Sequence, residues 1–340
     1  MTTSPNRAFL LPLFLGLLGG CAASVANQLP DGSPDAGPDA HDAGADAQDA
    51  GPGDGGATSA VLFGGENTTG ALADTWLWNG QGWTEQTTAL MPPARFSAVA
   101  GSLGTGLVVV GGTDTHGDNL ADTWVYDGTW QAPTVTGPLA RHQAASAVLA
   151  GELLVFGGMD ANRSPFGDTW AWDGSHWTEV ATSGPSARAG AAMAPLGAAV
   201  VLFGGYDPAT NVPVNETWSW DGSAWTSLPA AGPPARAAAV LAPFGGALYL
   251  FGGYDAQGNR LSDTWKWDGQ AWSSLAVSGP TGRSFACAAS LESGILLFGG
   301  LSDPANNVWL GDTWLWNGSS WSPLSVAGPA VRGACAMGAR

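Results

Sequence analysis

Basic residues are scarce in this 340-residue chain, and Lys266 is its single lysine. Acidic residues outnumber lysine and arginine together by 17. A surface with this balance repels the phosphates of nucleic acids and the headgroups of anionic lipids. We therefore expect no nucleic acid among the partners, and contact with a membrane only through an anchor.

Histidine is also rare, and the usual motifs of catalysis are missing. His41 lies in a low-complexity segment and His176 in a tight hairpin, so only His116 and His142 are expected to share a face. The Gly-x-Ser-x-Gly, His-Glu-x-x-His and phosphate-loop patterns do not occur. The sequence therefore indicates no catalytic residue and no cofactor.

The apolar run near the N-terminus, residues 8–18, is too short to span a bilayer as a mature helix. It follows Arg7 and precedes Leu18-Gly19-Gly20-Cys21, the layout of a secretion signal over residues 1–21. Small residues directly before a cysteine resemble the lipobox of bacterial lipoproteins, which predicts lipidation of Cys21. The alternative is an ordinary signal that is cleaved after Ala26, with Cys21 discarded.

Residues 22–56 contain no aromatic side chain and consist mainly of Ala, Asp, Gly and Pro. Such a segment cannot bury enough apolar area to offset the entropy of ordering. We expect a disordered tether that holds the remainder, residues 57–340, away from a membrane.

The rest of the chain is an internal repeat. Paired glycines begin at residues 64, 111, 157, 204, 252 and 299, at spacings of 46 to 48 residues. Every copy also contains an arginine three residues after a proline. These arginines are Arg95, Arg141, Arg188, Arg236, Arg283 and Arg332.

Each copy is predicted to form four short strands. In the fourth copy, small residues at 189–192 suit a first strand that converges with its equivalents, and apolar residues 198–203 predict a second strand buried on both faces. Trp218-Ser219-Trp220 places two indoles on one face of a third strand. Asp221-Gly222 then predicts a tight hairpin into a fourth strand that carries Trp225.

Four antiparallel strands about every 47 residues predict an all-β, six-bladed β-propeller. Gly-Gly after a hydrophobic strand, an aromatic third strand and a tryptophan in the fourth resemble the kelch repeat, over roughly residues 57–340. The chain departs from that pattern because Asp-Thr-Trp-x-Trp, with Glu216 in the fourth copy and Tyr126 in the second, replaces the usual single tyrosine. Galactose-oxidase-like copper enzymes and periplasmic sialic acid epimerases share this fold, but none of their active-site residues match here.

The two ends of the repeat complement each other. No arginine precedes the first Gly-Gly within the repeat region, whereas a spare segment, 332–340, follows the last tryptophan. We expect this segment to supply the innermost strand of the first blade and to close the ring.

Cys287 and Cys335 follow their repeat arginines by four and three residues, in the first strands of neighbouring blades. An oxidising compartment would permit a disulfide between them. The one-residue offset points the two side chains to opposite faces if both strands are regular. We therefore expect two small buried thiols.

The loops between second and third strands vary in length and content. We therefore expect the face that these loops form to determine which ligand is bound. Exposed aromatic, arginine and asparagine side chains suit a carbohydrate or a protein loop, although the same residues can also cover their own loops. The candidates are Arg163, Phe166, Tyr206, Tyr254, Arg260 and Trp309, with Asp114, His116, Asp118, Asn306 and Asn307 beside them.

The six repeat arginines are expected at the channel mouth on the same face. As a cationic collar they would bind a carboxylate or a sulfated or sialylated glycan. We favour the alternative, in which each arginine pairs with an acid of the repeat or with loop carbonyls. These acids are Asp74, Asp122, Asp168, Glu216, Asp263 and Asp312.

Paired oxygen-bearing residues also occur four positions apart in the variable loops. Calcium uses such oxygens, but turns use the same residues to bind their own backbone, and no calcium-loop motif is present. We therefore expect no metal site. The pairs are Asp114 with Asp118, Asp207 with Asn211, Asp255 with Asn259 and Asp303 with Asn307.

These observations predict a monomeric, lipid-anchored binding module at a bacterial outer membrane or cell surface. Its ligand would be a protein or a carbohydrate at the variable loops. The alternatives are an envelope carbohydrate-active enzyme, with His116 or His142 as its base, and a purely structural scaffold subunit.

Overall fold

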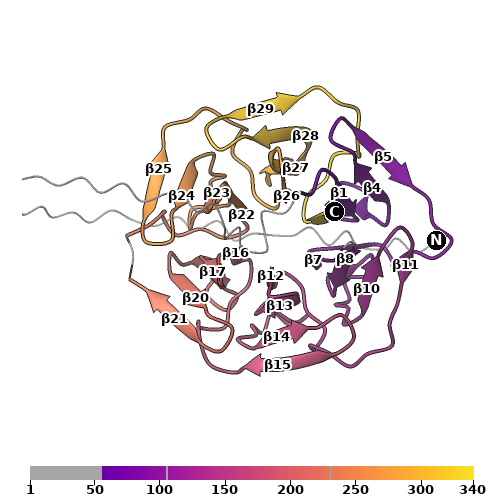
Figure 1. Cartoon of the computed structure of the whole chain (residues 1–340), viewed down its shortest axis with the longest axis horizontal. Helices are drawn as coiled ribbons and strands as arrows, with labels where there is room; N and C mark the ends of the chain where they lie inside the picture. The colour runs from indigo at the N-terminus through magenta and orange to yellow at the C-terminus, as the bar shows by residue number, and fades with distance from the viewer. Residues whose placement is uncertain (1–55, 105, 230) are drawn as a thin grey trace, which may run out of the picture. The chain divides into compact units, whose positions relative to one another are not determined.

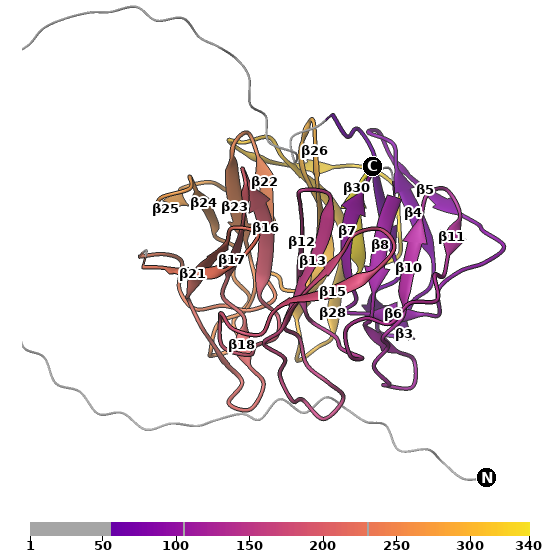
Figure 2. The same ribbon diagram turned by 60° about the horizontal axis from the view of Figure 1, so that its bottom comes forward.

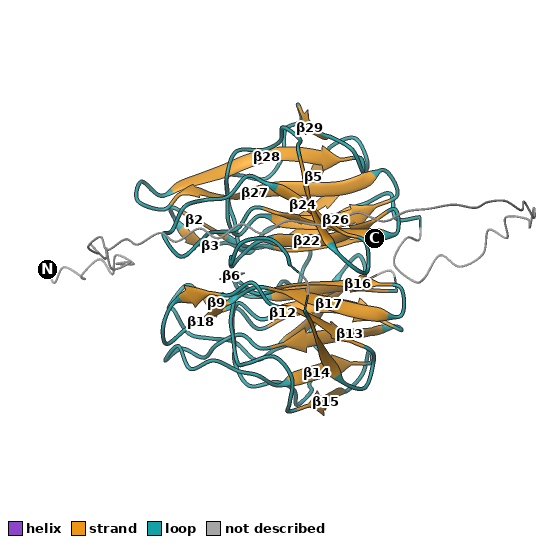
Figure 3. Ribbon diagram, turned by 90° about the vertical axis from the view of Figure 1, so that its left-hand side faces the viewer, coloured by secondary structure: helices purple, strands orange, loops and turns teal. Residues whose placement is uncertain are grey.

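The computed structural model describes residues 56–104, 106–229 and 231–340, and six four-stranded antiparallel sheets surround a central axis in it (Figure 1). The predicted signal peptide, with Cys21, and the tether up to residue 55 lie outside the described residues. Every regular element found in the described part is a strand (Figure 3). Consequently this part has no helix of the length and hydropathy needed to cross a membrane.

The sheets form six blades, each with its innermost strand first in the order of pairing. Blade 1 contains β30 (Ala336–Ala339), β1 (Ala60–Phe63), β4 (Thr75–Trp78) and β5 (Trp83–Gln86), and blade 2 contains β7 (Val99–Leu103), β8 (Gly106–Val110), β10 (Thr123–Tyr126) and β11 (Trp130–Gln131). Blade 3 contains β12 (Ala145–Leu149), β13 (Glu152–Phe156), β14 (Thr169–Trp172) and β15 (Trp177–Ala181), and blade 4 contains β16 (Ala192–Leu196), β17 (Ala199–Phe203), β20 (Thr217–Trp220) and β21 (Trp225–Leu228). Blade 5 contains β22 (Val240–Phe244), β23 (Ala247–Phe251), β24 (Thr264–Trp267) and β25 (Trp272–Leu275), and blade 6 contains β26 (Cys287–Leu291), β27 (Gly294–Asp303), β28 (Val308–Trp316) and β29 (Trp321–Leu324).

Short two-residue strands occur in the loops at one end of the propeller. Figure 2 shows β3, β6 and β18 together at this end. We call the surface made by the second-to-third-strand loops and the connections between blades the variable face, and the opposite surface the hairpin face. The short pairs are β2 (Glu66–Asn67) with β3 (Gly70–Ala71), β6 (Arg95–Phe96) with β9 (Thr113–Asp114), and β18 (Tyr206–Asp207) with β19 (Val212–Pro213).

The second strand of each blade is buried on both faces, as predicted. In β17, Val200 and Leu202 pack in the core shared with blade 3, while Val201 and Phe203 pack in the core shared with blade 5. Each blade is therefore completed by its neighbours.

The outer tryptophans connect the blades by hydrogen bonds as well as by packing. The Trp272 indole donates to the Thr217 hydroxyl of the preceding blade at 3.0 Å. The Trp83 indole makes the same bond to Thr313 at 3.1 Å, from blade 1 back to blade 6. The repeated tryptophan thus acts at every blade boundary, including the one where the ring closes.

The C-terminal segment completes blade 1, as predicted. Strand β30 pairs antiparallel with β1, and their register sets Ala60 opposite Ala339 and Phe63 opposite Ala336. The ring is thereby closed by pairing the first strand of the propeller with the last.

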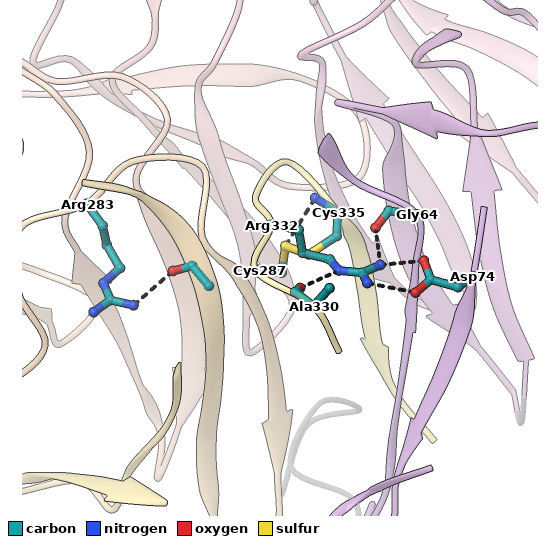
Figure 4. Close-up of a disulfide and its surroundings, with 8 residues drawn as sticks. Gly64, Asp74, Arg283, Cys287, Ala330, Arg332 and Cys335 are labelled. Carbon is teal, nitrogen blue, oxygen red and sulfur yellow. Dashed lines mark hydrogen bonds and ion pairs between the residues drawn. A yellow bond between two sulfur atoms is a disulfide. The ribbon is translucent and has the colours of Figure 1, made fainter. Parts of the chain in front are cut away.

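The prediction of free thiols is wrong, because Cys287 and Cys335 form a disulfide with their Cα atoms 5.8 Å apart (Figure 4). The prediction assumed two regular strands. Cys335 instead lies before β30 and directly follows Ala334, whose φ is +53°. This left-handed residue turns the chain and brings Cys335 onto Cys287, so blades 6 and 1 are covalently joined.

The paired glycines are required by the close approach of the following blade. At Gly204 a Cβ atom would lie 2.5 Å from the carbonyl oxygen of Arg236, and φ is +70°. Gly205 then donates its N–H to that same carbonyl at 3.0 Å. Only glycine combines this backbone conformation with this approach.

Candidate functional site

The six repeat arginines are not a collar open to ligand. Each is at most 3% exposed and binds the repeat acid of its own blade, as the favoured alternative stated. Arg236 is typical, with Nη1 and Nη2 at 2.6 and 2.8 Å from the two oxygens of Asp263 and Nη1 also donating to Gly252 O. Figure 4 shows the equivalent Arg332–Asp74 pair. Binding of ligand by these arginines is therefore excluded by burial.

The acids of these pairs are held as carboxylates. Burial would raise the pKa of Asp263, but the hydrogen bonds and charge of Arg236, with the Trp265 indole, outweigh it and lower the pKa. A group with a lowered folded-state pKa stabilises the fold above its unfolded pKa of about 3.9, and this contribution is lost as pH falls through the folded value. We therefore expect the pairs to persist at neutral pH.

Blade 4 has a weaker version of this pair. Arg188 contacts Glu216 through Nη2 alone, at 2.6 Å, and that nitrogen also donates to the Ser186 hydroxyl. The longer glutamate side chain replaces the two parallel bonds of an aspartate with one.

The residues after each arginine form a feature that the sequence did not reveal. The predicted first strand at 189–192 is wrong in extent, because β16 begins at Ala192 and the preceding residues turn across the channel. Two residues after every arginine stands a residue with φ between 53° and 64°. These six are Ser97, Gln143, Gly190, Ala238, Phe285 and Ala334.

The six left-handed residues are joined by a closed cycle of backbone hydrogen bonds, which we call the channel ring. Each N–H donates to the carbonyl of the equivalent residue in the preceding blade, for example Gln143 N to Ser97 O at 3.0 Å. Ala334 N donates to Phe285 O at 2.7 Å, and Ser97 N to Ala334 O at 2.8 Å, which completes the cycle through blade 1. The ring narrows the channel at the end nearer the variable face.

A hollow of about 170 Å³ lies at the channel ring and is lined by the ring residues and the residue after each. Most of the lining is alanine or glycine. Gln143 in blade 3 and Phe285 in blade 6 are the large exceptions, and two blades lie between them on either side of the ring. An amide and an aromatic ring therefore stand on opposite walls of an otherwise small-residue channel.

Two of the aromatic candidates are structural. Tyr206 is 4% exposed, its hydroxyl donates to Gln143 Oε1 at 2.9 Å, and burial raises its pKa to about 12. The Phe166 ring lies under the Arg141 guanidinium, 4.1 Å from ring centre to Cζ. Both were predicted as ligand contacts, and their packing makes them parts of the scaffold instead.

Tyr254, Arg260 and Arg163 remain accessible at the mouth of the channel. The Arg260 guanidinium stacks over the Tyr254 ring at 5.2 Å and donates to Gly258 O. Its buried Nε has no hydrogen-bond partner in the described part of the chain. Arg163 is exposed, has a φ of +65°, and contacts Asn211 Oδ1 at 3.4 Å. Neither arginine pairs with a carboxylate, in contrast to the six of the repeat.

Trp309 lies in a hairpin, which corrects its predicted place in a loop. It belongs to β28 and pairs with Leu301 of β27, and its indole donates to Asn307 Oδ1 at 3.1 Å. The indole is half-buried, so part of it is available on the variable face.

The two histidines proposed for catalysis are not arranged as an acid–base pair. His116 is exposed at a loop tip beside Asp114, 3.3 Å away. His142 is half-buried, and burial lowers its pKa to about 4, so it is neutral at pH 7. No hydrogen bond connects His142 to His116 among the described residues.

The paired oxygens of the variable loops are used by turns. Asp114 Oδ1 accepts the backbone N–H groups of His116 and Asp118 at 2.8 and 2.9 Å. Asp255 does the same for Gln257 and Asn259. Within the described residues no cluster of three potential metal ligands occurs.

Six four-stranded blades, Gly-Gly crossings and buried arginine–acid pairs define a repeat β-propeller. The family model described as the KLHDC2/KLHL20/DRC7 Kelch-repeats domain matches residues 55–237 and 196–339. The chain belongs to the kelch-repeat β-propeller family. Propellers of this kind are typically protein-interaction modules. A search of the curated proteins finds no match.

Sequence reasoning missed two polar residues at the mouth. Glu66 occupies the position after the first Gly-Gly, and Ser284 follows Arg283 with a buried hydroxyl that lacks a partner among the described residues. Only Glu66 had a sequence signal, because it is the one charged residue at its position among the six copies. Ser284 is small like the alanines and glycine at the same position of three other copies, so the sequence did not distinguish it.

Proposed function

We propose that this propeller is a binding module for a protein partner, which it holds on its variable face. The proposal rests on the distribution of the exposed apolar side chains, which gather on this face. Of the seven large hydrophobic side chains exposed in the described residues, six lie in loops or hairpin tips of this face, and only Val180 lies in an outer strand. The six are Leu90, Met91, Leu139, Val212, Val308 and Val331.

Such a distribution favours a protein over a carbohydrate. Exposed aliphatic side chains around a polar centre are typical of protein interfaces, whereas hydroxyl-rich ligands use aromatic faces and planar hydrogen-bonding groups. Leu139, at 69% exposed, is the clearest case. The aliphatic side chains would form the contact area around the channel mouth.

Arg260 and Arg163 supply the polar part of this interface. Burial of the Arg260 guanidinium lowers its pKa, although the charges of Asp255 and Asp303 oppose this shift. Among the described residues no carboxylate forms an ion pair with Arg260. An acidic side chain of the partner would complete the hydrogen bonding of Arg260, with the Tyr254 ring beneath it. The proposed partner therefore presents at least one carboxylate at the channel mouth.

The first described residues enter the propeller at the hairpin face. Ala57, the point at which the predicted tether joins the propeller, accepts a hydrogen bond from Glu292 N in the β26–β27 hairpin at 2.9 Å. This hairpin belongs to the hairpin face. Ala57 thus lies on the side of the propeller opposite the proposed interface.

We further propose that the protein is exported and anchored to a bacterial membrane through Cys21. The Cys287–Cys335 disulfide supports export, because such bonds persist in oxidising compartments. Wild-type protein is expected to partition into the detergent phase of a cloud-point separation, and Cys21→Ser to remain uncleaved or enter the aqueous phase. Equal detergent partitioning of the two proteins would refute the anchor.

The interface is tested by substituting its residues one at a time. A partner captured from envelope extract on the immobilised propeller would be purified and its Kd measured by calorimetry. We expect Arg260→Ala and Leu139→Ser to weaken binding by about 1 to 4 kcal/mol and to change the unfolding free energy by less than about 0.5 kcal/mol.

Val180→Ser, an equally conservative change at an exposed residue outside this face, is the control and should bind like wild type. If Val180→Ser weakens binding while the two variable-face variants do not, the interface lies elsewhere.

A further inference from the structure

The residue after each Gly-Gly pairs with the residue directly after a repeat arginine, and so lies next to the channel ring. In blade 4 this residue is Tyr206, which lies against Gly190 of its own blade and reaches Gln143 of the preceding one. In blade 1 the equivalent residue is Glu66. Its backbone pairs with Gly333 through two hydrogen bonds of 2.9 and 3.0 Å. The repeat thus places an acidic side chain where blades 3 to 5 carry methionine or tyrosine.

The Trp309 indole lies next to the backbone partner of Glu66, Gly333. Gly333 has no side chain, and the Trp309 indole fills its place, since a Cβ atom there would lie 2.8 Å from Trp309 Cζ3. The same Cβ would lie 2.9 Å from the carbonyl oxygen of Phe285, the channel-ring residue of the preceding blade. Glu66 therefore lies at the junction of blades 6 and 1, near the Trp309 indole and the backbone of Phe285, whose ring packs on Tyr254 of blade 5.

The Glu66 carboxylate has no partner among the described residues. It makes no ion pair and accepts no side-chain hydrogen bond, although the residue is half-buried. Burial alone raises its pKa to about 7. An unpaired, partly desolvated carboxylate is costly, and a cation that reaches it removes this cost.

We propose that Glu66 and Trp309 form a subsite for one basic side chain, a lysine or an arginine, of the protein partner. The carboxylate would pair with the cation, and the indole would contact its aliphatic stem and its charge. This inference rests on the proposed function, since it adds a second contact to the same face.

The subsite also makes the distribution of charge across the interface asymmetric. Arg163 and Arg260 belong to blades 3 and 5, whereas Glu66 belongs to blade 1 and Trp309 to blade 6. The mouth therefore offers cations on one side and an unpaired acid on the other. A partner segment with an acidic and a basic residue separated by the width of the mouth binds in one orientation.

The other charged groups on the surrounding elements are already engaged in ion pairs or hydrogen bonds. Arg332, next to Gly333, pairs with Asp74, and Arg95 in blade 2 pairs with Asp122. Asp303, at the tip of the β27–β28 hairpin, accepts hydrogen bonds from Asn306. Glu66 is therefore the group that controls the pH dependence of the subsite.

The test uses Nα-acetyl-lysine N-methylamide as the probe and the Trp309 indole N–H resonance as the readout, assigned with Trp309→Phe. At pH 8 we expect the probe to shift this resonance in the wild type, and the neutral norleucine analogue to leave it unchanged. Affinity should fall about tenfold from pH 8 to pH 6, because a carboxyl group with a pKa of about 7 is then only about one-tenth ionised. Glu66→Gln should abolish the shift.

Glu85→Gln, at an exposed glutamate of the outer strand β5, is the matched control and should respond like wild type. An equal response of Glu66→Gln, or of the norleucine analogue, would overturn the subsite. With the captured partner, loss of binding in Arg260→Ala but not in Glu66→Gln would remove the subsite and leave the proposed function standing. Unchanged binding in both variants would remove the proposed function itself.

Discussion

Deleting residues 332–340 is expected to abolish cooperative unfolding of the propeller. The deletion removes β30 from blade 1, the Arg332–Asp74 pair, one member of the channel ring and the disulfide to Cys287. β1 then exposes a row of unpaired backbone groups, and blades 1 and 6 lose their covalent link. The truncated protein should aggregate, or melt without a sharp transition in near-ultraviolet circular dichroism.

The matched control for this deletion is Arg340→Ala. That change removes one hydrogen bond to Asp127 O and the contact with the Tyr126 ring, but it keeps β30. Its melting curve should stay close to that of wild type. A truncated protein that melts as sharply and at the same temperature as Arg340→Ala would show that the C-terminal strand does not close the ring.

The second large effect is expected for the repeat arginines. Arg236→Met should lower the unfolding free energy by about 2 to 4 kcal/mol, because it removes two bonds to Asp263 and leaves the Gly252 carbonyl without that donor. Asp263 remains partly hydrated, which keeps the loss below that of a fully buried charge. Urea denaturation monitored by tryptophan fluorescence measures it.

Two comparisons sharpen this prediction. Arg188→Met should cost less than Arg236→Met, because Arg188 reaches Glu216 through a single nitrogen. Arg163→Ala, at an exposed arginine, should change stability by less than about 0.5 kcal/mol. If Arg236→Met is as stable as Arg163→Ala, the repeat arginines are not part of the scaffold.

The fold was predictable because six copies repeat the same signals. Glycine pairs, Trp-x-Trp and Asp-Gly hairpins each fix one part of a blade, and the spare C-terminal segment indicated how the ring closes. The arginine–acid pairs were also the favoured alternative, since a residue that is present in every blade is expected to have the same structural role in each.

The site was less predictable for two physical reasons. Left-handed conformations at Gln143, Phe285 and Ala334 come from hydrogen bonds between blades, which no local sequence signal announces. The left-handed conformation of Ala334 is also the reason why Cys287 and Cys335 form a disulfide and are not the free thiols that were predicted. A non-glycine residue with positive φ reflects tertiary context.

The second reason is that the role of a loop residue depends on its position within the repeat, which its residue type alone does not show. Phe166 stands two residues before Asp168, where the other copies carry leucine or valine. This register would have identified it as a packing residue. The same comparison would have singled out Glu66, the only acidic residue directly after a Gly-Gly pair of the repeat.

The most direct test of the binding face is amide hydrogen exchange of the propeller with and without its captured partner. We expect new protection in the variable loops, at residues 160–166, 255–261 and 303–310, and none in the hairpins at 173–176 and 221–224. Protection confined to those hairpins would contradict the account, because the partner would then be bound on the hairpin face.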